Sequence, residues 1–292
     1  MKEKIKIVIS CALILVCLPY LITYFFQGEK TSATSQENKD DEIVGILAAQ
    51  IPMNMKEEVL KAQAVIARTQ LAYCKNNQLE NPKSLTQKEM QELWGQKKYY
   101  EYYEKMVSAV EATDGQVMTF QGEVINPAFH KVCAGYTRDG STVYKDTPYL
   151  LSVKSEADIL SEDYLKVQFF TAKEYMERQA CLLPELGAEE KPVAEIINSI
   201  ELQRDGAGYV TAIKIQGTEV AVDAFLDTFE LPSANFSVKE MDDQVRMVTK
   251  GCGHGYGLSQ YGANEMAKNK KTYEEILKYY FSGIKIEQTG KH

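Results

Sequence analysis

The residues best suited to chemistry gather in a glycine-rich stretch near the end of the chain. Residues 251–257 read Gly-Cys-Gly-His-Gly-Tyr-Gly, and Ser259 and Gln260 follow closely. Glycines let the backbone pass close to a ligand and present its amide groups, and His254, Ser259 and Gln260 add polar side chains. The glycine spacing, with no acidic residue in a following strand about 20 positions on, does not fit a dinucleotide-binding loop. We therefore expect a binding loop for a ligand other than a nucleotide.

A second group of reactive residue types lies in the middle of the chain, at His130 and Cys133. If this segment meets the glycine-rich stretch, the pairs His130–Cys133 and Cys252–His254 have the residue types of a zinc site. Cys133 and His254 also have the groups of a cysteine hydrolase. Hydrogen-bonded cleft histidines are the simpler interpretation, and we expect neither a metal nor a cofactor.

The chain outside residues 7–26 contains four cysteines, which allow three pairings that the sequence does not distinguish. Free buried thiols are the simpler alternative, and the first bridge to test is Cys133–Cys252. The four are Cys74, Cys133, Cys181 and Cys252.

The start of the chain indicates a membrane anchor. Residues 7–26 carry no charge, and a helix of this length spans roughly 30 Å, the thickness of a bilayer core. Lysines precede the segment and acidic residues follow it, so the positive-inside rule places the N-terminus in the cytoplasm and the remainder outside. We expect a single-pass protein of the cell membrane. The net charge of −8 argues against a nucleic-acid partner.

The elements that must position these residues follow an order of helices, strands and helices. Asn54 with Glu57 predicts the start of a helix whose apolar residues recur at three- and four-residue spacing. Thr86 with Glu89 predicts a second helix towards Glu111, broken at Gly95. Strands are predicted at 117–120, 123–129, 209–215 and 245–248, and helices at 259–269 and 273–280. Residues 161–193 give no clear pattern.

This order predicts an α+β fold, a single mixed domain after an N-terminal transmembrane helix. The expected organisation is a cytoplasmic stub and anchor (1–26), a linker (27–42), the domain (43–287, in parts 43–153 and 154–287) and a tail (288–292). Two features of the helices are open. Lys61 and Arg68 fit structural ion pairs better than a catalytic role. Tyrosines either stack on sugar rings or form a half-buried helix face, at Tyr99, Tyr100, Tyr102 and Tyr103.

Three stretches together resemble the SpoIID/LytB family, which comprises sporulation stage II protein D and the amidase enhancer LytB. Residues 46–52 (ILAAQIP) and 58–69 (EVLKAQAVIART) resemble its "AAEMP … EALKAQAVAART" block. Residues 129–137 (FHKVCAGYT) resemble "fHSxSGGxT", and residues 253–263 (GHGYGLSQYGA) resemble "GHGVGMSQYGA". The resemblance covers roughly residues 43–287.

The resemblance implies lytic transglycosylase action on peptidoglycan during forespore engulfment, which releases 1,6-anhydro-muropeptides. The family's general acid is the glutamate of "AAEMP", and the matching residue here is Gln50. An amide has no proton to give near neutral pH, so we expect a loss of at least about 10²–10⁴-fold in rate. Gln50 is then a degenerate catalytic position in a retained glycan groove. The expected substrate-binding residues are His130, His254, Ser259, Gln260 and Tyr261.

Two alternatives remain open. The first is an active lytic transglycosylase whose acid is replaced by Asp139, Glu57 or Glu58. The second is a non-catalytic enhancer of a cell-wall amidase. The expected partners are peptidoglycan glycan strands and the membrane, with a cell-wall amidase and other sporulation membrane proteins as further candidates. Residues 75–95 contain neither His nor Cys, so the zinc cluster of some family members is not expected.

Overall fold

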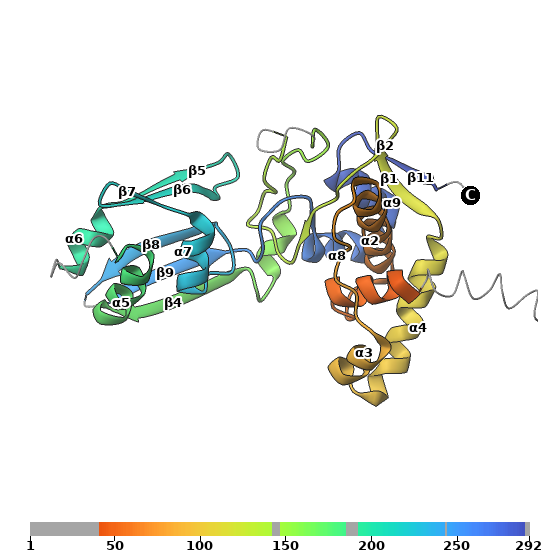
Figure 1. The fold of residues 1–292 in the computed structure, drawn as a ribbon, viewed down its shortest axis with the longest axis horizontal. Helices are drawn as coiled ribbons and strands as arrows, with labels where there is room; N and C mark the ends of the chain where they lie inside the picture. Colours follow the sequence, from red (N-terminus) through yellow and green to blue (C-terminus); the bar gives the residue numbers. More distant parts are fainter. Residues whose placement is uncertain (1–40, 142–146, 185–191, 243, 290–292) are drawn as a thin grey trace, which may run out of the picture.

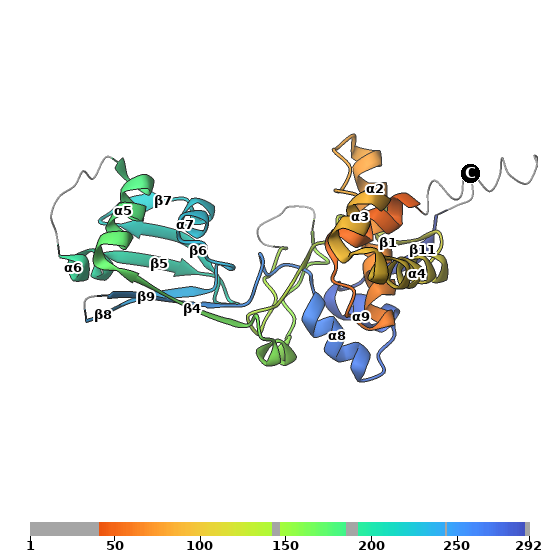
Figure 2. The ribbon, with the colours of Figure 1, turned by 90° about the horizontal axis from the view of Figure 1, so that it is seen from below.

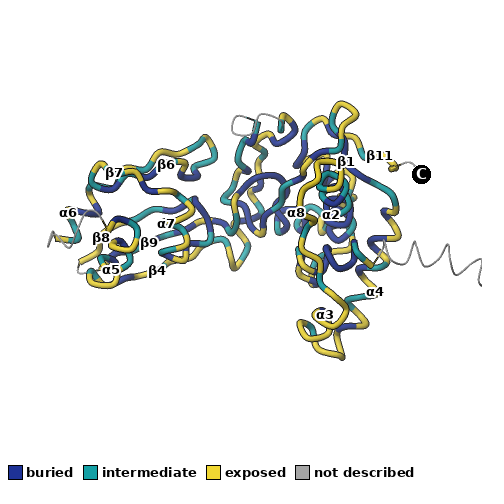
Figure 3. Tube along the Cα trace, in the orientation of Figure 1, coloured by how far each residue is buried: buried dark blue, intermediate teal, exposed yellow. Residues whose placement is uncertain are grey.

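The computed structural model describes residues 41–141, 147–184, 192–242 and 244–289. Helices and strands form two hydrophobic clusters that follow one another along the long axis of the molecule (Figures 1 and 3). The predicted α+β class is confirmed. Within the described ranges no helix is long and apolar enough to cross a membrane. The predicted span 7–26 and most of the linker lie outside these ranges.

The first cluster forms around helix α2 (Glu57–Asn77). Its two adjacent apolar stripes leave Ala62, Val65 and Ile66 fully buried. The helix contacts α4 (Gln96–Ala112), α8 (Gln260–Lys268), α9 (Tyr273–Tyr280) and β1 (Gln116–Phe120). Strand β1 pairs with β2 (Glu123–Val124) and with β11 (Lys285–Gln288). The last described strand therefore completes the cluster that the first described residues begin.

The predicted cap of α2 is wrong, because the helix begins after Lys56 rather than Asn54. No side chain of the N-cap residue bonds the first turn. Instead, the backbone N–H of Lys56 donates to Oδ1 of Asn264 (2.8 Å). A side chain 208 positions away supplies this acceptor, so the local pattern did not indicate it.

The second predicted helix is confirmed, including its break. Helix α3 (Gln87–Trp94) begins with a capping box between Thr86 and Glu89, and Gly95 separates it from α4. The tyrosines of α4 confirm the half-buried helix face, since Tyr99 is buried whereas Tyr100 is 62% exposed.

The second cluster contains two three-stranded sheets. One has the order β4-β9-β8 (Leu165–Thr171, Gln244–Lys250, Phe236–Met241), and the other β5-β6-β7 (Ile200–Arg204, Val210–Ile215, Thr218–Val220). Helices α5 (Ala172–Leu182), α6 (Val193–Asn198) and α7 (Val222–Phe229) complete it. Aromatic rings of Tyr175, Phe225, Phe229 and Phe236 fill its centre. The strands predicted at 209–215 and 245–248 are confirmed.

The two motif stretches meet between the clusters. Strand β3 (Phe129–His130) pairs in parallel with β10 (Leu258–Ser259), so that His130 lies opposite Ser259. An isolated bridge then joins Val132 to Cys252. A 3-10 helix, Glu156–Leu160, packs beside α8. The middle segment and the glycine-rich stretch are therefore neighbours in space, as the sequence analysis required for a joint site.

Candidate functional site

Four glutamines form a hydrogen-bonded group around Gln50, which we call the glutamine cluster (Gln50, Gln63, Gln70 and Gln260). Gln63 Nε2 donates to Gln50 Oε1 (2.9 Å), and Gln50 Nε2 donates to Gln70 Oε1 (2.8 Å). Gln260 Nε2 donates to the backbone oxygen of Gln50 (2.8 Å). Both ends of the Gln50 amide therefore have partners, and among the described residues these partners are all amides.

Helix α2 positions two members of the cluster. Gln63 and Gln70 lie seven residues, or about two turns, apart and so share one helix face. Gln70 Nε2 donates to the backbone oxygen of Pro127 (2.8 Å), and this bond turns its Oε1 towards Gln50. Gln63 is fully buried, whereas Gln50 is only half-buried. The cluster thus extends from the core towards the surface.

A buried carboxylate organises a second group, the aspartate cluster (Asp158, Ser155, Ser259, Tyr280 and the backbone N–H of Cys133). Asp158 Oδ1 accepts from the Ser259 hydroxyl (2.6 Å) and from the Cys133 N–H (2.9 Å). Its Oδ2 accepts from the Ser155 hydroxyl, whose oxygen lies 2.8 Å from the Tyr280 hydroxyl. Burial raises the pKa of Asp158, and the hydrogen bonds from Ser155 and Ser259 oppose this rise.

Residues of the GHGYGLSQYGA stretch contribute hydrogen bonds and close packing to these two clusters. Ser259 caps α8 by accepting from the Gly262 N–H (3.2 Å). A Cβ at Gly262 would lie 2.3 Å from both the Ser155 and the Tyr280 hydroxyl oxygens, so only glycine leaves room for the aspartate cluster. A Cβ at Gly257, whose φ is +66°, would lie 2.0 Å from the Ala128 oxygen. Both glycines are thus required by close packing of the protein on itself.

The two described histidines lie together, with ring centroids 5.9 Å apart. Burial, with a smaller effect of His254, lowers the pKa of His130 to about 3. The neutral ring donates from Nδ1 to the Tyr256 oxygen (3.0 Å), while its Nε2 is buried without a partner in the described chain. His254 is exposed, and its Nδ1 accepts from the Tyr256 N–H (3.0 Å).

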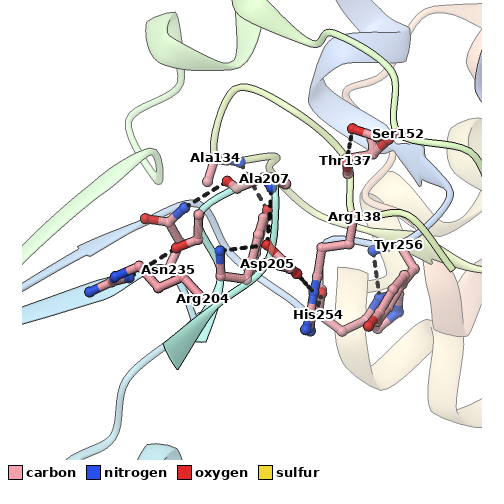
Figure 4. Close-up of polar contacts among 12 residues, drawn as sticks. Ala134, Thr137, Arg138, Ser152, Arg204, Asp205, Ala207, Asn235, His254 and Tyr256 are labelled. Carbon is pink, nitrogen blue, oxygen red and sulfur yellow. Dashed lines mark hydrogen bonds and ion pairs between the residues drawn. The ribbon is translucent and has the colours of Figure 1, made fainter. Parts of the chain in front are cut away.

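Arg138 joins the two halves of the molecule beside this loop (Figure 4). Its Nε contacts Asp205 Oδ2 of the second half at 2.7 Å, and its backbone N–H donates to Gly255. The guanidinium lies 4.5 Å from the ring centroid of Tyr256 and 5.2 Å from that of Tyr209. The glycine-rich stretch is therefore fixed by a nearly buried arginine that contacts both halves.

The cysteines do not support the cysteine-hydrolase alternative. Burial, together with Asp158, raises the pKa of Cys133 to about 12, so its thiol stays protonated. All four cysteines of the described ranges are free, and the backbone of Cys252 pairs with Val132. In the same ranges no group of three or more His, Cys, Asp or Glu residues is arranged to hold a metal ion, so the His₂Cys₂ site is not formed.

Comparisons with known proteins agree with the motifs. The model of the family described as "Stage II sporulation protein" matches residues 27–120. Stage II sporulation protein D of Bacillus subtilis (strain 168) is 32% identical over 276 residues, which cover 89% of this chain and 78% of that protein. The chain belongs to the SpoIID/LytB family. This membership supports a role in sporulation that is related to the cell wall.

Two further members are similar over most of the chain. Stage II sporulation protein D of Bacillus amyloliquefaciens is 29% identical and covers 89% of this chain and 77% of its own length. A protein named amidase enhancer, from Bacillus subtilis (strain 168), is 24% identical and covers 83% of this chain but 40% of its own length. The SpoIID/LytB likeness therefore extends across both halves of the molecule.

The site residues predicted for this SpoIID/LytB member do not form one group in the structure. Gln50 and Gln260 lie together in the glutamine cluster, whereas Ser259 belongs to the buried aspartate cluster. His130 is buried and His254 exposed. Tyr261 is half-buried, with its N–H donating to the Lys131 oxygen (3.1 Å). Their roles in glycan binding stay predictions.

The three candidate replacement acids have other partners. Glu57 and Glu58 pair with Lys61 at 2.7 and 2.9 Å, and Glu58 also accepts from the Tyr273 N–H. Asp139 accepts from the Ser141 N–H (2.9 Å). Within the described chain none of them contacts the Gln50 side chain, so the structure gives no support to a substituted acid.

Sequence reasoning missed three important residues. Gln63 lies within the quoted EVLKAQAVIART stretch, but nothing in its spacing linked it to Gln50. Gln70 follows that stretch directly, and Asp158 lies just before the segment that gave no clear pattern. Arg68 donates to backbone oxygens near the end of α4, including that of Val110 (3.1 Å), a role that the sequence did not indicate.

Proposed function

We propose that this chain is a sporulation protein that binds peptidoglycan glycan strands and has a strongly impaired lytic transglycosylase step. The observation that carries the proposal is the state of Gln50. Its amide oxygen accepts from Gln63 and its amide nitrogen donates to Gln70, so the side chain is held by two neutral partners. The position that the family resemblance assigns to the general acid therefore holds a fixed carboxamide.

The chemistry explains the impairment. Cleavage of a glycosidic bond requires a proton for the leaving oxygen, and closure of the 1,6-anhydro ring requires a base for the C6 hydroxyl proton. One carboxyl group can do both, first as acid and then as base. A carboxamide can donate a hydrogen bond to the glycosidic oxygen but transfers no proton. Binding can therefore persist where cleavage is lost.

We extend the proposal to the cellular setting. Residues 7–26 would anchor the protein as a single-pass membrane protein, with residues 43–287 outside the cytoplasm. The support is the uncharged segment with lysines before it and acidic residues after it. In that place the domain would reach the cell wall while remaining attached to the membrane.

A second candidate function is enhancement of a cell-wall amidase. The similarity to a protein named amidase enhancer favours it. An enhancer needs to hold its substrate and its partner, and it needs no general acid of its own. A chain with Gln50 in place of the glutamate satisfies this requirement.

The test uses the full-length protein with purified sacculi. We expect co-sedimentation with sacculi and no 1,6-anhydro-muropeptides by mass spectrometry. Tyr261→Ala should weaken co-sedimentation. Tyr100→Ala, which removes an exposed tyrosine from helix α4, should not. Absence of binding would overturn the proposal, and anhydro products from the unaltered protein would overturn the impairment. Faster release of peptides by an added amidase would support the enhancer function.

A further inference from the structure

The β4-β9-β8 sheet has one covered and one uncovered face. Residues at alternate positions, such as Phe170, Val245 and Met247, point into the second cluster and are buried. Figure 2 shows α5, α7 and the β5-β6-β7 sheet on that side, and no element of the described chain beyond the other side. We call the uncovered side the open face.

An apolar stripe runs along the open face on the edge strand β4. Its alternate residues Leu165, Val167 and Phe169 are 53%, 44% and 55% exposed. Val167 lies directly opposite Val248 of β9, which extends the stripe towards the middle of the sheet. Single exposed apolar residues are ordinary, but adjacent ones on a flat face are typical of an interaction surface.

Cations lie beside the stripe in register with it. Arg246 of β9 lies opposite Phe169 on β4 and opposite Lys239 on β8, and Lys250 lies opposite Leu165. None of these three side chains has an ion pair or a hydrogen bond in the described chain, and Arg246 Nε is buried without an acceptor. A buried unsatisfied donor costs free energy, which a bound acceptor recovers.

Among the paired positions of its three described strands, the open face carries no acidic residue to balance these cations. Its remaining positions in register are Thr171, Gln244, Ser237 and Met241. This is unusual in a chain with net charge −8. The charge of the face is therefore complementary to an acidic partner.

We propose that the open face docks an extended protein segment that directs both apolar and acidic side chains towards the sheet from one of its two faces. The apolar side chains lie on the stripe of Leu165, Val167 and Phe169. A carboxylate reaches Arg246, whose planar guanidinium can hold it through two parallel bonds. This proposal rests on the sheet alone and does not depend on the proposed function.

Two observations favour a protein segment over other anionic partners. Arg246 is half-buried beside the apolar stripe, which favours an acceptor on a side chain packed against the sheet over one in a headgroup layer above it. The stripe contains leucine and valine, which lack the flat ring faces on which sugars stack. A protein segment supplies both the carboxylate and the apolar side chains.

The experiment measures, by anisotropy, binding to the full-length protein of a fluorescent peptide with the repeat Val-Ser-Glu-Ser, whose valines and glutamates share one face when the peptide is extended. We expect saturable binding that weakens at least about tenfold in the double variant Lys239→Glu/Arg246→Glu. Phe169→Ser should also weaken it. Matched controls are Lys88→Glu and Leu93→Ser, which change an equally exposed lysine and leucine on α3 and should leave binding unchanged. The same peptide with lysine in place of glutamate should not bind.

Three outcomes would overturn the proposal. The first is that the peptide does not bind, or that the open-face variants bind it as tightly as the unaltered protein does. The second is flotation with phosphatidylglycerol vesicles that depends on Lys239 and Arg246 while the peptide does not bind, which would assign the face to a membrane. The third is a dimer in sedimentation velocity that the same variants dissociate without any peptide binding, which would assign it to a second copy. Circular dichroism of each variant confirms that the fold is intact.

Discussion

The glutamine cluster and the aspartate cluster lie side by side, yet they contain opposite chemistry. Two consecutive residues connect the clusters. The Ser259 hydroxyl donates to Asp158, and the Gln260 side chain donates to the backbone oxygen of Gln50. The aspartate cluster holds a carboxyl group that is fully buried by hydroxyl and N–H donors. The glutamine cluster reaches the surface but holds only amides.

A buried carboxyl group can organise packing, whereas catalysis requires an accessible one, and the two clusters differ in this respect. Asp158 has its hydrogen bonds satisfied inside the protein and no access to a substrate, so it organises the packing of the GHGYGLSQYGA stretch. Gln50 is half-buried, at the surface end of its cluster, but lacks an ionisable group. The chain therefore uses a buried carboxyl group for packing and carries an amide at the position that the family resemblance assigns to the acid.

The largest expected effect on stability comes from removing the buried carboxylate. Asp158→Ala should lower the free energy of unfolding by about 3 kcal/mol, because it leaves several buried donors without an acceptor. Chemical denaturation measures this loss. Asp163→Ala, which removes an exposed carboxylate paired with Lys131, should cost less than about 1 kcal/mol. Equal losses in the two variants would show that Asp158 organises nothing.

A pH titration sharpens the comparison through His130, which lies opposite Ser259 between the clusters. Its pKa is about 3 in the folded state and 6.5 ordinarily, so the unfolded chain binds the proton first as the pH falls. Stability should therefore fall between pH 6.5 and about 3, by about 2 kcal/mol from pH 7 to pH 5. In His130→Gln this part of the pH dependence should disappear. An unchanged slope would contradict a buried neutral ring.

A smaller effect is expected from filling the space that the aspartate cluster uses. Gly262→Ala gains helix propensity but forces a Cβ against two hydroxyl groups, for a net loss of about 1 kcal/mol. Gly206→Ala is the matched control, since its Cβ meets nothing within 4 Å. Thermal unfolding of the two variants compares them, and no difference would mean that the cluster can move aside.

Much of the fold near these clusters follows from local sequence signals. The Thr86–Glu89 capping box, the Gly95 break and the helix at 273–280 depend on neighbouring residues, and all three are confirmed. The cap of α2 was mispredicted because its acceptor, Asn264, is distant in sequence. Strand β4 alternates apolar and polar residues from Leu165 to Phe169, a strand signal that was missed because Phe170 and the helix that follows interrupt it.

The candidate site was harder to predict than the fold. The family resemblance drew attention to Gln50, but its partners Gln63 and Gln70 come from helix α2, and no spacing rule connects them to Gln50. Asp158 carries no motif of its own, and only the packing of Ser259 against it shows its role. Residues that act through tertiary hydrogen bonds leave little trace in a single sequence.

The most direct test of the central claim is to restore a carboxyl group at position 50. Gln70 Oε1 faces this side chain and would accept a hydrogen bond from a protonated carboxyl, which favours the acid form. We predict that full-length Gln50→Glu releases 1,6-anhydro-muropeptides from sacculi at least about 10²-fold faster than the unaltered protein. Gln70→Glu, which adds the same group one hydrogen bond away, should remain silent. Equal release by the unaltered protein and Gln50→Glu would contradict the account.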